Sequence, residues 1–258
     1  MNIISVDLPW GKNTKGRTAI AITDLRGNLR IERANNDNEL LELIRKKAEP
    51  GSIILLDIPI EGCNKLNDKH FRPVDSALQH CGISLLPSSN GERGKGLKEE
   101  LERRNKRIAV YEIYPYAIYK FLACLKEKSA LGLLNRLTTE RVLNEEFEKS
   151  KKGWPPRYKR AAGEERQQAI RFLYSLLTDP AIRLSGLDRP GSLSLARLGD
   201  EYDACLGAIV GLYWVKRSKY ACLAGKPEEG EILLLADQWL QTELEKKEVQ
   251  VRNNEKRG

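Results

Sequence analysis

The order of apolar segments in the amino-terminal part of the chain constrains the fold most. Residues 2–6 form a short apolar run with β-branched residues, and residues 17–23 and 28–33 resemble the next strands, with turns between them. This pattern predicts an antiparallel meander. Leucines at helical spacing in residues 38–47 and an apolar run at 53–56 then predict a helix and a buried strand. The order strand, strand, strand, helix, strand indicates an α/β protein with a mixed sheet.

The remaining segments predict further elements around this sheet. Residues 61–106 are polar and rich in glycine, so we expect an irregular insertion carrying short helices. Strand patterns return at residues 107–114 and 231–235, and helical patterns at 116–128, 138–148, 164–177 and 201–216. We expect one domain over residues 1–242, with the insertion at about 61–106, and a charged tail over 243–258.

Composition excludes several classes of protein. The chain has 258 residues, 41% of them hydrophobic, which is enough for a substantial core without disulfides or structural metals. No secretory signal or membrane-spanning run occurs, so we expect a cytoplasmic protein outside the membrane. The five cysteines form no CxxC pair, which argues against a zinc site. The net charge of +8 permits attraction to nucleic acid but does not establish it.

Two aspartates directly follow apolar strands. Asp7 follows Ile3-Ile4-Ser5-Val6, and Asp57 follows Ile53-Ile54-Leu55-Leu56. Ligand sites of open α/β sheets lie at the carboxyl ends of strands, and neighbouring parallel strands would hold these carboxylates roughly 5 Å apart. Such a pair either shares a proton or recruits a cation, and oxygen ligands favour Mg²⁺ or Mn²⁺. Each aspartate precedes a proline-containing loop, so a simple turn-forming role is the alternative.

Other acidic residues are weaker candidates. Asp200 and Asp203 are three residues apart at the start of an apolar helical segment, where one can face the sheet edge. Asp200 would equally serve as a helix N-cap there. Glu112 is the charged member of an apolar strand, so it is either paired with a base or facing a site.

Taken together, six short motifs in this order resemble domain of unknown function family 429. They are Asp7, Leu56-Asp57-Ile58-Pro59, Phe71-Arg72-Pro73-Val74-Asp75, Tyr111-Glu112-Ile113-Tyr114-Pro115, Tyr158-Lys159-Arg160 and Asp200-Glu201-Tyr202-Asp203-Ala204. The resemblance covers nearly the whole chain, from about residue 2 to about residue 235. Members of that family are described as nucleases of the ribonuclease H-like fold.

The resemblance implies a fold and a metal site. The fold is a mixed sheet, with three antiparallel strands and further strands parallel to the first, flanked by helices. Asp7, Asp57 and Asp203 would then hold divalent metal, with Asp200 as a further ligand. Glu112 or Asp200 would orient a metal-bound water.

The expected function is metal-dependent hydrolysis of phosphodiester bonds in DNA or RNA. Two metals neutralise the phosphate and activate a water in such reactions. Arg72, Tyr158 and Lys159 are candidates for phosphate binding and base stacking, although basic residues more often form solvated faces.

Two other functions fit the same sequence. One is a nucleic-acid-binding protein that has no activity but keeps the fold. The other is an actin-like or sugar-kinase-like phosphotransferase, which the single copy of the core and the absence of a P-loop motif disfavour.

Overall fold

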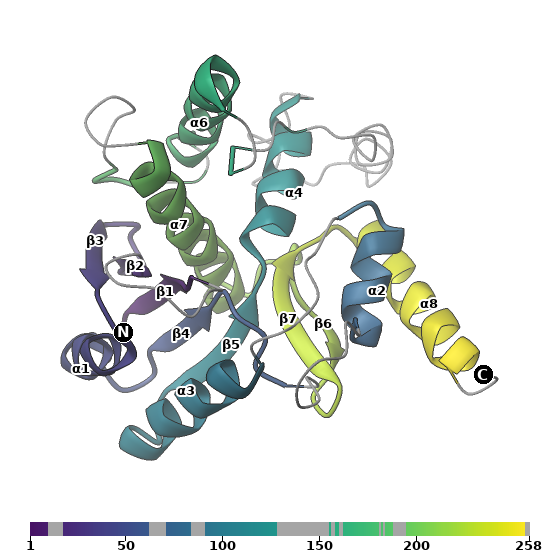
Figure 1. The fold of residues 1–258 in the computed structure, drawn as a ribbon, viewed down its shortest axis with the longest axis horizontal. Helices are drawn as coiled ribbons and strands as arrows, with labels where there is room; N and C mark the ends of the chain where they lie inside the picture. Colours follow the sequence, from purple (N-terminus) through teal and green to yellow (C-terminus); the bar gives the residue numbers. More distant parts are fainter. Residues whose placement is uncertain are drawn as a thin grey trace.

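A seven-stranded mixed sheet forms the centre of the protein (Figure 1). The computed structural model describes residues 1–9, 18–61, 71–83, 91–127, 155, 158–159, 162–180, 182, 184–187 and 195–255. The strands are ordered β3-β2-β1-β4-β5-β7-β6 across the sheet. Their bounds are Ile3–Asp7 for β1, Thr18–Thr23 for β2, Leu29–Ala34 for β3, Ile53–Leu56 for β4, Ala109–Ile113 for β5, Ala221–Lys226 for β6 and Gly230–Leu235 for β7.

The strand directions divide the sheet into antiparallel and parallel parts. β1, β2 and β3 pair antiparallel, as their short connections require. β4 pairs parallel to β1, β5 to β4 and β7 to β5, whereas β6 pairs antiparallel to β7. The expected α/β class with a mixed sheet flanked by helices is therefore confirmed, and the predicted strands match within two residues at each end.

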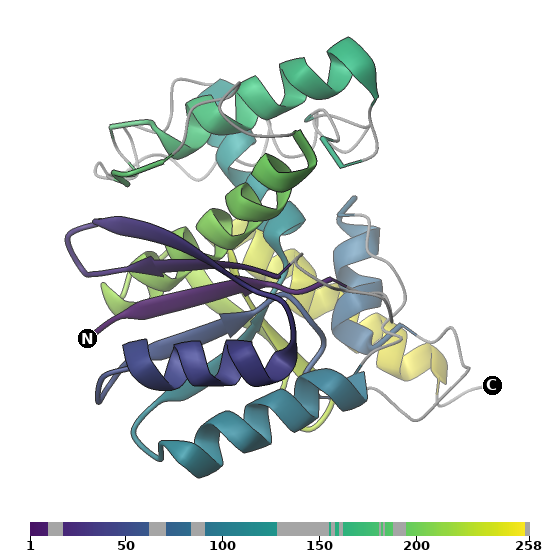
Figure 2. The ribbon, with the colours of Figure 1, turned by 60° about the vertical axis from the view of Figure 1, so that its left-hand side comes forward.

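Helices cover both faces of the sheet (Figure 2). Their bounds are Asp37–Lys47 for α1, Pro73–His80 for α2, Gly91–Arg104 for α3, Pro115–Glu127 for α4, Gly163–Leu177 for α6, Leu195–Val215 for α7 and Gln238–Glu255 for α8. α7 crosses one face of β1, β2 and β4 and carries α4 and α6 on its outer side, while α1 and α3 lie on the opposite face. α2 packs against α8 beside β6 and β7.

Two hydrophobic cores follow from the alternation of side chains along the central strands. Ile3 and Leu55 point into the core beneath α7. Ile4 and Leu56, one residue further along each strand, point into the core lined by α1 and α3. Both strands are fully buried, which explains why their sequences are continuous apolar runs.

Two glycines bring α7 unusually close to the sheet. A Cβ added to Gly207 would lie 2.0 Å from Ser5 Oγ, and one added to Gly211 would lie 2.5 Å from Ile3 Cγ2. These two positions are one helical turn apart, so they form a stripe that contacts β1. Asp203 lies one turn before Gly207 on the same stripe. The glycines thereby fix the height of Asp203 above the sheet.

Four expectations differ from the structure or fall outside it. β6 is a strand that the sequence pattern did not predict, because it contains no β-branched residue. It is stabilised as a strand by its antiparallel pairing with β7 across the turn at residues 227–229. α7 begins at Leu195, so Asp200 lies inside the helix and is not its N-cap. The tail expected from residue 243 continues α8 through Glu255. The helix expected at residues 138–148 lies outside the described residues.

Within the described part of the chain, no helix is both long enough and apolar enough to cross a membrane.

Candidate metal centre

The ends of β1 and β4 place two aspartates side by side. Val6 pairs with Leu56, and the Asp57 backbone N–H donates to the Val6 carbonyl at 2.9 Å, so the parallel ladder continues one step beyond β4. Asp7 shares a strand face with Ile3 and Ser5, and that face lies under α7. Asp57 lies two residues after Leu55, so its side chain is on the same face of the strand as Leu55, which also lies under α7. Both carboxylates therefore emerge on the α7 side of the sheet.

The helix α7 supplies the third carboxylate. Asp203 faces the ends of the two strands because the glycine stripe behind it packs onto β1. Glu201, which is buried, fixes the first turns of the helix from the other side by accepting hydrogen bonds from Arg33 at 3.1 Å and Arg197 at 2.9 Å. The orientation of Asp203 thus depends on both helix packing and these ion pairs.

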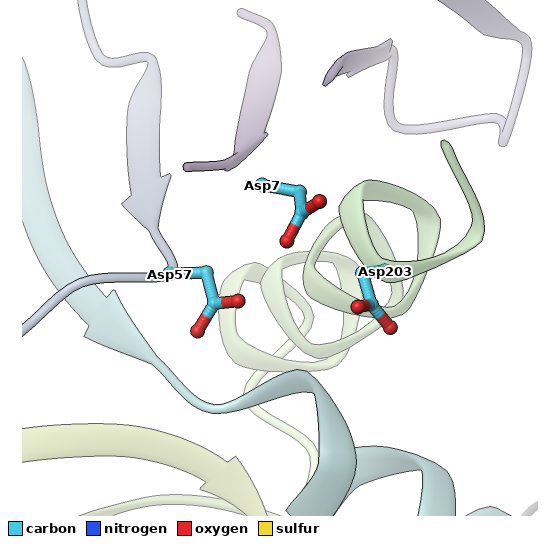
Figure 3. Close-up of side chains that lie close together, drawn as sticks. All are labelled: Asp7, Asp57 and Asp203. Carbon is cyan, nitrogen blue, oxygen red and sulfur yellow. The ribbon is translucent and has the colours of Figure 1, made fainter. Parts of the chain in front are cut away.

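Asp7, Asp57 and Asp203 form one cluster, called the acidic trio below. One carboxylate oxygen from each residue lies within 4.8 Å of those from the other two. All three residues are buried, with at most 6% of their surface exposed. Figure 3 shows Asp7 and Asp57 at the ends of neighbouring strands and Asp203 opposite them on the helix. The separation of roughly 5 Å expected between Asp7 and Asp57 agrees with this geometry.

Two neighbouring residues, Tyr158 and Lys159, already contact the trio. The Tyr158 hydroxyl donates a hydrogen bond to Asp203 Oδ1. Lys159 Nζ contacts Asp203 Oδ2 and lies 3.3 Å from Asp7 Oδ1. Tyr158 is buried, with its ring 5.3 Å from that of Tyr119 between centroids, so it supports Asp203 and offers no exposed face for base stacking. The Lys159 side chain remains 47% exposed.

With all three carboxylates ionised, the trio would carry more negative charge than the cations of the described residues in contact with it neutralise. Burial, followed in smaller measure by the charges of Asp203 and Asp200, raises the pKa of Asp7 to about 7 against the lowering effect of Lys159. Burial, followed by the charge of Asp7, raises the pKa of Asp57 well above its ordinary value. Burial lowers the pKa of Lys159, but the three carboxylates outweigh it and raise that pKa overall. One ammonium group therefore does not balance three carboxylates.

The donor set of the trio suits a hard divalent cation. All three side chains offer oxygen, and carboxylate oxygens are the ligands that Mg²⁺ and Mn²⁺ prefer. A divalent cation would also reduce the repulsion between the three carboxylates. Asp200, one turn before Asp203 and half-buried, is close enough for its charge to act on Asp7, but it is not a member of the trio.

Glu112 and Arg72 lie in a second buried cluster, which does not include any member of the trio. Arg72, Asp75 and Glu112 form what is called the Arg72 cluster below. Arg72 Nη1 donates to Glu112 Oε2 at 2.7 Å, and Nη2 donates to Asp75 Oδ1 at 2.8 Å. Burial raises the pKa of Glu112, and the Arg72 guanidinium opposes this shift. The structure thus places Arg72 among carboxylates and gives Glu112 an arginine partner.

The Arg72 cluster anchors the loop that follows Asp57. Glu112 Oε2 accepts the Ile60 backbone N–H at 2.9 Å, and Arg72 Nη1 donates to the Glu61 carbonyl at 3.0 Å. A Cβ added to Gly94 of α3 would lie 1.9 Å from the Pro59 carbonyl oxygen, so the helix also packs tightly on this loop. These contacts make Glu112 and Arg72 supports for the position of Asp57.

A separate arginine anchors the loop after Asp7. Arg93 Nη1 donates to the Pro9 carbonyl at 2.8 Å, and the same guanidinium binds both oxygens of Asp37 at the start of α1. Both carboxylate-bearing strand ends are therefore held by buried or half-buried arginines on neighbouring elements.

Sequence patterns alone did not identify Asp75 and the supporting roles of Tyr158 and Lys159. Asp75 stands three residues after Arg72 at the start of α2, where an acidic residue typically completes a capping box, and its carboxylate does accept the Arg72 backbone N–H. That spacing is a signal for a local partner. No comparable local signal exists for Lys159, because its partners lie far away in the sequence.

No protein-family model, curated protein or solved structure matches this chain. The geometry and chemistry of the acidic trio therefore carry the functional inference.

Proposed function

We propose that this protein is a divalent-metal-dependent nuclease with a ribonuclease H-like fold. The observation that carries this proposal is the convergence of three buried carboxylates, from two strand ends and one helix, with Lys159 as the one cation in contact with them among the described residues. Two further features support it: the order and direction of β1 to β5, which agree with the arrangement that the resemblance implies, and the motifs themselves.

The residues of the chain have distinct roles in this proposal. Asp7, Asp57 and Asp203 hold Mg²⁺ or Mn²⁺, and Asp200 orients a nearby water. A bound divalent ion supplies charge neutralisation at the phosphate and an activated water. Tyr158 fixes the rotamer of Asp203, and Lys159 contributes positive charge on the exposed side of the trio. The substrate is nucleic acid, toward which the net charge of +8 favours association.

Cleavage assays with matched aspartate variants test this function. Purified protein is incubated with single-stranded and double-stranded DNA and RNA in Mn²⁺, in Mg²⁺ and in EDTA. We expect metal-dependent cleavage of at least one polymer, and loss of that cleavage in Asp57→Asn.

Asp24→Asn is the control, because Asp24 follows β2 at the opposite end of the sheet from Asp7. It should cleave as the wild type does. Cleavage that persists in EDTA or in Asp57→Asn contradicts the proposal, and so does the absence of cleavage of every polymer.

A further inference from the structure

Lys159 would compete with a divalent ion for the carboxylate oxygens of the acidic trio. Both oxygens of Asp203 are already engaged, Oδ1 by the Tyr158 hydroxyl and Oδ2 by Lys159 Nζ. Lys159 also lies 3.3 Å from Asp7 Oδ1. Two of the three carboxylates therefore share one ammonium group.

An ammonium group and a divalent cation that contact the same carboxylates repel each other strongly. Repulsion between two cations is strong in a partly buried site when both contact the same carboxylate, and the double charge of the ion doubles it. The Lys159 ammonium and a metal ion held by Asp7 and Asp203 are therefore mutually exclusive neighbours, and one of the protein groups must move when the ion binds.

Of the two groups on Asp203, Lys159 is the one able to move. Tyr158 is buried and its ring packs edge-on against Tyr119. The Lys159 side chain is 47% exposed, and its flexible four-carbon stem allows the ammonium to swing into solvent. Tyr158 therefore stays hydrogen-bonded to Asp203, whereas Lys159 can move away from it.

We propose that Lys159 is a built-in counter-cation, which holds Asp7 and Asp203 together before the divalent ion binds and must leave them when it does. This inference rests on the proposed function for the identity of the competing ion. Its consequence is that Lys159 lowers the affinity of the site for metal, while it stabilises the protein without metal. The released ammonium then lies at the exposed side of the site, where a substrate phosphate would approach.

Mn²⁺ binding in the absence of nucleic acid tests the role of Lys159. We expect Lys159→Met to bind Mn²⁺ about tenfold or more tightly than the wild type by titration calorimetry, because no ammonium has to be displaced. Lys159→Arg, which keeps the charge, should bind Mn²⁺ close to or more weakly than the wild type. In EDTA, Lys159→Met should melt at a lower temperature than the wild type, and Mn²⁺ should raise its melting temperature by a larger increment.

Two further variants make the result interpretable. Lys47→Met removes a half-buried lysine that pairs with Glu32 at 3.0 Å, and it should leave Mn²⁺ affinity unchanged. Lys159→Gln, which keeps a hydrogen-bond donor without the charge, replaces the methionine variant in the titration if that variant does not fold in EDTA.

The outcomes separate this inference from the nuclease proposal. Unchanged or weaker Mn²⁺ binding by both uncharged Lys159 variants overturns the counter-cation role, even if the wild type cleaves nucleic acid. Tighter binding that is lost on adding Asp57→Asn supports that role, even if no polymer is cleaved. Failure of the wild type and of all Lys159 variants to bind Mn²⁺ overturns both.

Discussion

The raised pKa of Asp7 makes the stability of the metal-free protein depend on pH in an unusual direction. The pKa is about 7 in the folded protein, against an ordinary value of 3.8, because of burial and neighbouring carboxylates. Between these values the folded protein keeps a proton that the unfolded chain has lost. Stability therefore falls as the pH rises through this window, whereas aspartates with a lowered pKa give the opposite slope.

The size of this change in the free energy of unfolding follows from the shift in the pKa of Asp7. About three pKa units correspond to roughly 4 kcal/mol at pH 8, of which a little under 2 kcal/mol is already present at pH 5. Asp7→Asn removes this titration. We therefore expect the stability of Asp7→Asn relative to the wild type to increase by about 2 to 3 kcal/mol between pH 5 and pH 8 in EDTA.

Urea denaturation at the two pH values measures this difference, with Asp24→Asn as control. Hydrogen bonds from Asn28 lower the pKa of Asp24, so its replacement should not produce a gain at pH 8. Saturating Mn²⁺ should stabilise the wild type at pH 8 much more than Asp7→Asn. An equal stability difference at pH 5 and pH 8 would refute the electrostatic account of the trio.

Three further variants test how the site is supported. Gly207→Ala should destabilise the protein by about 1 to 3 kcal/mol in urea, because its Cβ would overlap Ser5 Oγ, and Ser5→Ala should recover part of the loss. Arg72→Met should cost about 3 to 5 kcal/mol, more than Glu112→Gln, since only the former leaves two buried carboxylates without their cation; a reversed order in urea denaturation contradicts this assignment. Tyr158→Phe should cost about 1.5 to 3 kcal/mol of stability by losing a hydrogen bond to a buried carboxylate, and unchanged thermal melting in EDTA would oppose it.

The strand-end aspartates could be predicted because their environment is local. Each directly follows a continuous apolar run, and the parallel pairing of those runs places Asp7 beside Asp57 whatever else surrounds them. Asp203 was a weaker prediction, because the helix that carries it begins six residues earlier than the apolar pattern indicated. The residues before Asp200 include Arg197 and Gly199, which do not mark a helix by apolar spacing.

The partners of the charged residues could not be predicted in the same way. Lys159 reaches Asp7 across 152 positions of sequence, and Arg72 reaches Glu112 across 40. A basic residue near aromatic residues fits phosphate binding as well as an ion pair when only its neighbours in sequence are known. Which role it takes depends on the tertiary packing, since burial decides whether a carboxylate needs that cation.

The origin of the trio also bears on how the protein matures during synthesis. A growing chain that has been synthesised only as far as β5 contains Asp7 and Asp57, whereas Asp203 follows 90 residues after the end of β5, on α7. The complete acidic trio therefore forms only after contacts of very long range in the sequence have formed, and such contacts are slow to form. In the proposed function, the metal ion should accordingly bind late, once the fold is complete.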